Sequence, residues 1–243
     1  MRLRCAFELI ISLSLVLGVG LGVAGELADF NGAVEAAASH HRAVLGYLRT
    51  GNTDLAVAEL ERMDKEWQAL VARFADRRPD AFDGNELYAQ TLTGVASKLA
   101  TAHVLIDSGR AETARDALQT IRGELAALRR ASGIVVLADC VLDANNAMDA
   151  LFVYKDAPPD WPRPQVRSDV SGKAAILGHE LRRCDAIAPA SVRNNAEIRR
   201  LIDGALASLA LVPKSIETRD SDLLIRVLIE LRSFDNLLAF RFG

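Results

Sequence analysis

The sequence has little of what would place it in several common protein classes. Its 243 residues include seven prolines and sixteen glycines, too few for a collagenous or low-complexity chain. The formal net charge is only −3 and half of the residues are hydrophobic, which excludes a disordered acidic chain and a strongly basic nucleic-acid binder. What remains is a globular chain of one or two domains, long enough to bury roughly 70% of its unfolded surface.

Sequence motifs for catalysis are missing as well. There is no Gly-x-Ser-x-Gly segment, no glycine-rich phosphate loop and no Cys-x-x-Cys pair. The four histidines lack the Glu-x-x-His and His-x-x-x-His spacings that are typical of di-iron and zinc sites. We therefore expect neither an enzyme nor a metal site.

The first residues have the layout of a secretory signal peptide. Arg2 and Arg4 precede an apolar run over residues 9–24, and residues 23–25 are the small Val-Ala-Gly. This order predicts a cleaved signal peptide over residues 1–25 and export to a bacterial periplasm. The alternative is an inner-membrane anchor formed by uncleaved residues 9–24, although this run is shorter than the ~20 residues that a spanning helix needs. We expect no transmembrane segment after cleavage.

The rest of the chain has the pattern of an all-α protein. Alanine, leucine, arginine and glutamate dominate, and apolar residues recur at spacings of three and four. Such stripes run over residues 55–74, 114–128 and 224–238. Breaks at residues 50–52, 78–80, 108–109, 132–133, 157–164, 189–194 and 218–220 divide the chain into about eight antiparallel helices.

A shift of 110 residues aligns the chain with itself. Helix breakers match at this offset, because Pro79 aligns with Pro189 and Gly94 with Gly204. The other matches are Arg73/Arg183, Asn85/Asn195, Leu99/Leu209, Ala100/Ala210, Ile106/Ile216, Leu118/Leu228, Arg122/Arg232 and Leu128/Leu238. The offset predicts two tandem repeats that each resemble a four-helix bundle, over residues 26–131 and 132–243.

Two cysteines, Cys140 and Cys184, remain after the predicted cleavage. They flank the proline-rich loop over residues 157–164 at similar distances, so antiparallel helices would place them at nearly the same height. In an oxidising compartment this arrangement favours a disulfide. The alternative is two buried thiols that face different directions.

Polar residues are frequent just after residue 137. Asp139, Asp143 and Asn146 share one helical face at spacings of four and three. This face is either exposed to solvent or forms a polar line or cation site between the two halves. Arginines of the second half could pair with it: Arg182, Arg183, Arg199 and Arg200.

The last ten residues are rich in large apolar side chains. They indicate packing between the two halves or a homodimer contact. The residues concerned are Phe234, Leu237, Leu238, Phe240 and Phe242.

An exported, alanine-rich unit of four helices resembles the cytochrome c′ and c556 group. Members of that group attach haem through Cys-x-x-Cys-His near the end of the fourth helix, and residues 128–132 and 238–242 contain neither cysteine nor histidine. The resemblance therefore implies at most a non-covalent haem. Its axial ligand would be Met63, Met148 or His103.

Two hypotheses for function follow. The first is an exported, non-enzymatic protein that binds another protein or a small ligand, on a helical surface or in a cleft between its halves. The second is a haem- or metal-binding bundle related to cytochrome c′.

Overall fold

The computed structural model describes residues 20–243, and throughout this range the regular elements are helices, without a strand. The predicted all-α fold is confirmed. Most of the predicted signal peptide, residues 1–19, lies outside the described residues. No helix in the described range is both long enough and apolar enough to cross a membrane.

The first half of the chain contains four long helices. Helix α1 (Gly20–Thr50) turns through Gly51 into α2 (Thr53–Phe74), and a short 3-10 helix, η1 (Asp80–Phe82), leads to α3 (Leu87–Asp107). Gly109 then joins α3 to α4 (Ala111–Ala131). Gly51 and Gly109 have φ values of 77° and 74°, in the left-handed region that favours glycine and ends a helix.

A single core holds these helices together. Trp67 is buried, and its indole Nε1 donates a hydrogen bond to the Leu92 carbonyl at 3.1 Å. Phe30 packs edge-on against Phe82 with 5.1 Å between ring centroids. The predicted stripe over residues 55–74 supplies much of this core, because its large side chains from position 60 onward are buried.

The second half begins with α5 (Leu137–Asp156) and α6 (Pro164–Ile187), followed by the short α7 (Ala190–Arg193). It ends with α8 (Ala196–Leu209), α9 (Val212–Thr218) and α10 (Ser221–Phe242). The sequence breaks predict one helix between residues 195 and 217, whereas the structure has two. Pro213 explains the difference, because proline has no N–H to donate to the preceding turn.

The second half has its own core, built around a disulfide. Cys140 on α5 and Cys184 on α6 are bonded, with 5.4 Å between their Cα atoms. Both are buried among the apolar side chains of α5, α6, α8 and α10. The predicted disulfide is therefore present, and it joins the two helices that border the proline-rich loop.

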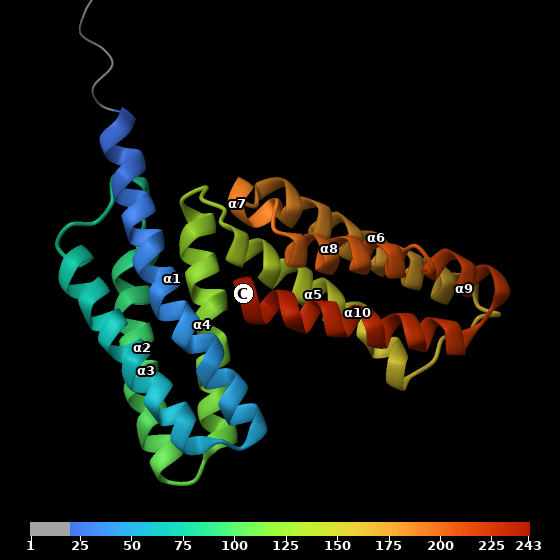
Figure 1. The fold of residues 1–243 in the computed structure, drawn as a ribbon, viewed down its shortest axis with the longest axis horizontal. Helices are drawn as coiled ribbons and strands as arrows, with labels where there is room; N and C mark the ends of the chain where they lie inside the picture. The colour runs from blue at the N-terminus through green and yellow to red at the C-terminus, as the bar shows by residue number, and fades with distance from the viewer. Residues whose placement is uncertain (1–19) are drawn as a thin grey trace, which may run out of the picture.

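Figure 1 shows the two halves as separate groups of helices that meet where α4 passes into α5. In each half the first long helix packs along the second. Asn85 and Asn195, which align in the 110-residue offset, both accept backbone N–H groups at a helix start through their side-chain carbonyls. The tandem duplication itself stays a prediction.

Candidate functional site

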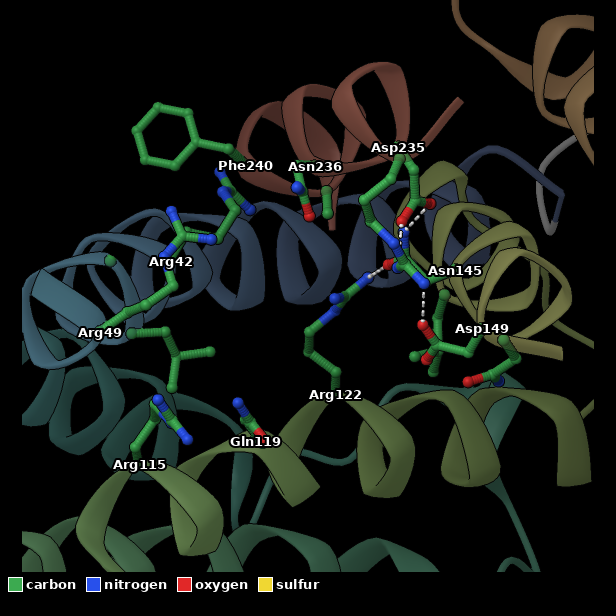
Figure 2. Close-up of a pocket in the computed structure, with 16 residues that line it drawn as sticks. Arg42, Arg49, Arg115, Gln119, Arg122, Asn145, Asp149, Asp235, Asn236 and Phe240 are labelled. Carbon is green, nitrogen blue, oxygen red and sulfur yellow. Dashed lines mark hydrogen bonds and ion pairs between the residues drawn. The ribbon is translucent and has the colours of Figure 1, made fainter. Parts of the chain in front are cut away.

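A cleft of about 400 Å³ lies between the halves. Helices α1 and α4 form one wall, and α5 and α10 form the other (Figure 2). Five arginines line it, and we call it the arginine cleft: Arg42, Arg49, Arg115, Arg122 and Arg232. Arginine guanidinium groups are the side chains best suited to bind carboxylate or phosphate.

Helical spacing brings the arginines of the first half to one wall. Arg42 and Arg49 are seven residues apart on α1, and Arg115 and Arg122 are seven apart on α4. Seven residues are close to two helical turns, so each pair projects from one face of its helix. The packing of α1 against α4 then places both pairs around one space (Figure 2).

The arginines differ in how they are paired. Arg232 contacts both Asp149 and Asp235, with N–O distances of 2.6 and 3.0 Å. Arg42 pairs with Glu35 at 2.7 Å and also donates to the Gly243 carbonyl at 3.0 Å.

Arg115 pairs with Glu112 at 2.6 Å, outside the cleft lining. Arg49 and Arg122 form no ion pair with a side-chain carboxylate within residues 20–243, unlike the other three arginines of the cleft.

Arg122 lies at the centre of the cleft, directed toward the opposite wall (Figure 2). Its Nη2 donates to the amide oxygen of Asn145 at 3.0 Å, while its Nε is buried and has no hydrogen-bond partner in the described part of the chain. Burial lowers the pKa of Arg122; Asp235 opposes this effect and Arg42 adds to it. A guanidinium nevertheless stays protonated in proteins, so Arg122 is a partly buried cation whose side-chain hydrogen-bond partner within residues 20–243 is a neutral amide.

The second-half wall is polar and, with two aspartates and one arginine, carries a formal charge of −1. Asn145 donates through Nδ2 to Asp235 at 2.5 Å, and Asp235 in turn accepts from Arg232. Burial raises the pKa of Asp235, although these two hydrogen-bond donors oppose the rise. With five arginines and two aspartates, the cleft lining carries a formal charge of +3 in a chain whose net charge is −3.

The predicted polar face does not act as a unit. Asp139 is only 2% exposed, and it accepts three hydrogen bonds from Nε and Nη2 of the buried Arg129, the shortest at 2.5 Å. Asp143 pairs with Arg183 at 2.6 Å and with Arg130. Both aspartates therefore join α5 to neighbouring helices. The expectation of a solvent-exposed face is wrong for Asp139, which is buried.

Asn146 is the one member of that face that lines the arginine cleft. Of the four arginines expected to pair with the face, Arg183 does so, whereas Arg199 pairs with Asp185 at 2.6 Å. No group of three or more histidine, cysteine or acidic side chains is arranged to hold a metal ion in residues 20–243. A cation site has no support at this face, because its carboxylates already contact guanidinium groups.

The residues proposed as haem ligands are not brought together. Met63 is buried in the core of the first half, and Met148 is buried in that of the second. His103 lies on α3, and none of the three lines the arginine cleft. The C-terminal apolar residues are also divided, since Leu238 is buried in the second core while Phe240 is 56% exposed and lines the cleft.

The arginine cleft itself is not predicted by the sequence reasoning. Two signals for it exist in the sequence. Arg122 and Arg232 align in the 110-residue offset, and arginines recur at a spacing of seven near residues 42 and 115. Neither signal says which helices face each other, so the five positions become a site only in the folded chain.

Comparison with protein families, curated proteins and solved structures finds no match for this chain.

Proposed function

We propose that this chain is an exported, non-enzymatic binding protein that holds a small anionic ligand in the arginine cleft. The observation that carries the proposal is Arg122, a partly buried guanidinium whose Nε has no hydrogen-bond partner and which forms no ion pair with a side-chain carboxylate within residues 20–243. A buried charge without a counter-charge is destabilising by several kcal/mol. An anion in the cleft would supply that counter-charge.

The shape of the cleft supports a small ligand. Its volume of about 400 Å³ lies within the ~300–1,000 Å³ typical of small-molecule sites. The wall opposite Arg122 offers amide groups of Asn145, Asn146 and Asn236, which donate and accept hydrogen bonds without adding charge. Such a wall can orient a ligand while the arginines neutralise it.

Two features support export and binding rather than catalysis. A buried disulfide is typical of proteins in oxidising compartments, as the predicted signal peptide requires. The cleft lining has no serine, cysteine, histidine, lysine or tyrosine in the described part of the chain, and its two carboxylates, Asp149 and Asp235, are paired with Arg232. A nucleophile with an adjacent base is therefore missing there.

Isothermal titration calorimetry with inorganic phosphate and citrate tests the proposal, with glucose as the uncharged comparison. Arg122→Gln removes the charge but keeps a hydrogen-bond donor. A charge-assisted hydrogen bond contributes ~1.5–3 kcal/mol, so we expect the anion to bind about 10- to 100-fold more weakly. Arg182→Gln is the matched control, because Arg182 is exposed on α6 and lies outside the cleft.

A second variant blocks the space instead of the charge. Gly46 lines the cleft, and a Cβ placed there would meet no atom within 4 Å. Gly46→Trp should therefore fill the cleft without disturbing the bundle, whereas Gly32→Trp, at an exposed site on the same helix, should not affect binding. The proposal is wrong if phosphate and citrate do not bind to the unmodified protein. It is also wrong if they bind to Arg122→Gln and to Gly46→Trp as tightly as to the unmodified protein.

A further inference from the structure

A second cavity of about 370 Å³ lies between the halves, next to the arginine cleft. Most of its surface is apolar, and we call it the apolar cavity. Apolar side chains from α1, α4, α5, α7 and α10 line it, among them Val34, Ala38, Leu125, Leu137, Val192 and Phe242.

The two cavities meet at Arg122, which lines both of them. The last turn of α10 also takes part in both, with Phe240 in the arginine cleft and Phe242 in the apolar cavity. An anionic group paired with Arg122 would therefore stand where a cationic space adjoins an apolar one.

The other charged groups of the apolar cavity already have partners. Arg129 pairs with Asp139, and Arg241 pairs with Glu197 on α8 at 2.7 Å. Glu35 pairs with Arg42. Arg122 is thus the cationic side chain of this cavity that forms no ion pair with a side-chain carboxylate within residues 20–243, so we expect a ligand here to carry a single anionic group and otherwise apolar surface.

We infer that the ligand is an amphiphilic anion, a single molecule whose charged head pairs with Arg122 and whose alkyl chain occupies the apolar cavity. This inference rests on the proposed function, because the head is the anion that the arginine cleft would hold. It adds a second energetic contribution, the transfer of methylene groups from water into the apolar cavity.

A chain-length series separates the two contributions. Titrations would use inorganic phosphate and then butyl, hexyl and octyl phosphate, each below its micelle concentration, on the protein as purified after export. Each methylene that enters the apolar cavity should tighten binding about fourfold, until the cavity is full. Octanoate, as a second arm, shows whether a carboxylate head serves as well as a phosphate head.

Two variants place the alkyl chain in the structure. Ala38 lines the apolar cavity, so Ala38→Phe should fill it and return octyl phosphate to the affinity of inorganic phosphate. Ala36→Phe is the control, because Ala36 is exposed on the same helix and lies outside the cavity. Inorganic phosphate should bind both variants as it binds the unmodified protein.

The outcomes distinguish the inference from the proposed function. Equal affinity for phosphate and octyl phosphate would overturn the inference of an amphiphilic ligand but leave the proposed anion site intact. If neither compound binds, both the inference and the proposed function are overturned. A chain-length effect that survives Ala38→Phe would place the alkyl chain elsewhere and overturn the inference. Pelleting with phosphatidylglycerol vesicles, without binding of monomeric octyl phosphate, would also overturn it, because the site would then meet a membrane surface.

Discussion

Acidic pH should lower the free energy of unfolding of the first half of the protein through one histidine beside the arginine cleft. His41 on α1 is only 2% exposed, and its Nε2–H donates to the Leu118 carbonyl on α4 at 2.9 Å. Burial lowers the pKa of His41 from 6.5 to about 4, the carbonyl partially opposes this, and the charges of Arg122 and Arg42 lower it further. His41 is therefore neutral in the folded protein at pH 7.

The size of the effect follows from the two pKa values. Because the unfolded chain binds a proton at about pH 6.5 and the folded chain only near pH 4, the stabilising contribution of neutral His41 is complete above pH 6.5 and is lost as the pH falls toward 4. The gap of about 2.5 between the pKa values corresponds to about 3 kcal/mol in all. About 2 kcal/mol of this should be lost between pH 7.5 and pH 5.

Urea unfolding at several pH values measures this loss. Trp67 is buried in the first core and Trp161 in the second, so in a Trp161→Phe background the fluorescence of Trp67 reports on the half that contains His41. His41→Gln in the same background keeps a hydrogen-bond donor but cannot titrate in this range. The difference in unfolding free energy between the two proteins should shrink by about 2 kcal/mol from pH 7.5 to pH 5.

Comparison with the glutamine variant is necessary because other groups titrate as well. Burial raises the pKa of Asp235, so the contribution of this residue to the free energy of unfolding increases as the pH falls. This increase partly masks the loss from His41. His179→Gln, at an exposed position on α6, controls for the substitution itself. If the difference between the parent and His41→Gln does not change with pH, His41 is not held neutral by burial and the reasoning fails.

Two further predictions concern stability alone. Replacing both Cys140 and Cys184 with alanine should lower the free energy of unfolding by about 4 kcal/mol, since the bond closes a separation of 44 residues; urea unfolding measures this, and a loss below about 1 kcal/mol would contradict it. Gly94→Ala should stabilise the protein by about 0.5–1 kcal/mol, because the new Cβ would meet only a carboxylate oxygen at 3.7 Å. Gly204→Ala, at the aligned position, should destabilise it by about 1–3 kcal/mol, because that Cβ would lie 2.7 Å from the Phe234 ring; equal melting temperatures for the two variants would contradict this pair.

The sequence predicts the helices and the disulfide because both depend on short-range order. Gly51 and Gly109 end helices through their local backbone conformation, independently of the tertiary structure. An apolar stripe on a helix becomes buried against whichever apolar surface it meets, so its burial can be predicted without knowing the partner helix. The pairing of the two cysteines can be predicted from the lengths of the two helices and their antiparallel arrangement around one loop. The break before α9 is harder to place, because Pro213 also fits within the first turn of a helix.

The functional surface is less predictable because it depends on how the two halves face each other. Asp139 and Asp143 have the helical spacing of a solvent-exposed face, and nothing within α5 distinguishes that from a face covered by arginines of α4. Only the pairing of Asp139 with Arg129 across the junction buries its carboxylate. Charged periodicity predicts a polar face, but the partner of that face is a property of the tertiary structure.

The position of the arginine cleft follows from the presence of two separate cores. Each half buries its own apolar stripes, so the helices that meet between the halves are free to carry polar side chains. Arg42, Arg115 and Arg232 are paired with carboxylates, but Arg122 forms no ion pair with a side-chain carboxylate within residues 20–243, and its repulsion by Arg42 opposes folding. Arginines that serve only solubility could lie anywhere on the surface, where acidic side chains could pair with them. Solubility therefore does not explain why these arginines are clustered. A bound anion would remove the repulsion at Arg122, which supports the proposal that the cluster is a binding site and not only part of the scaffold.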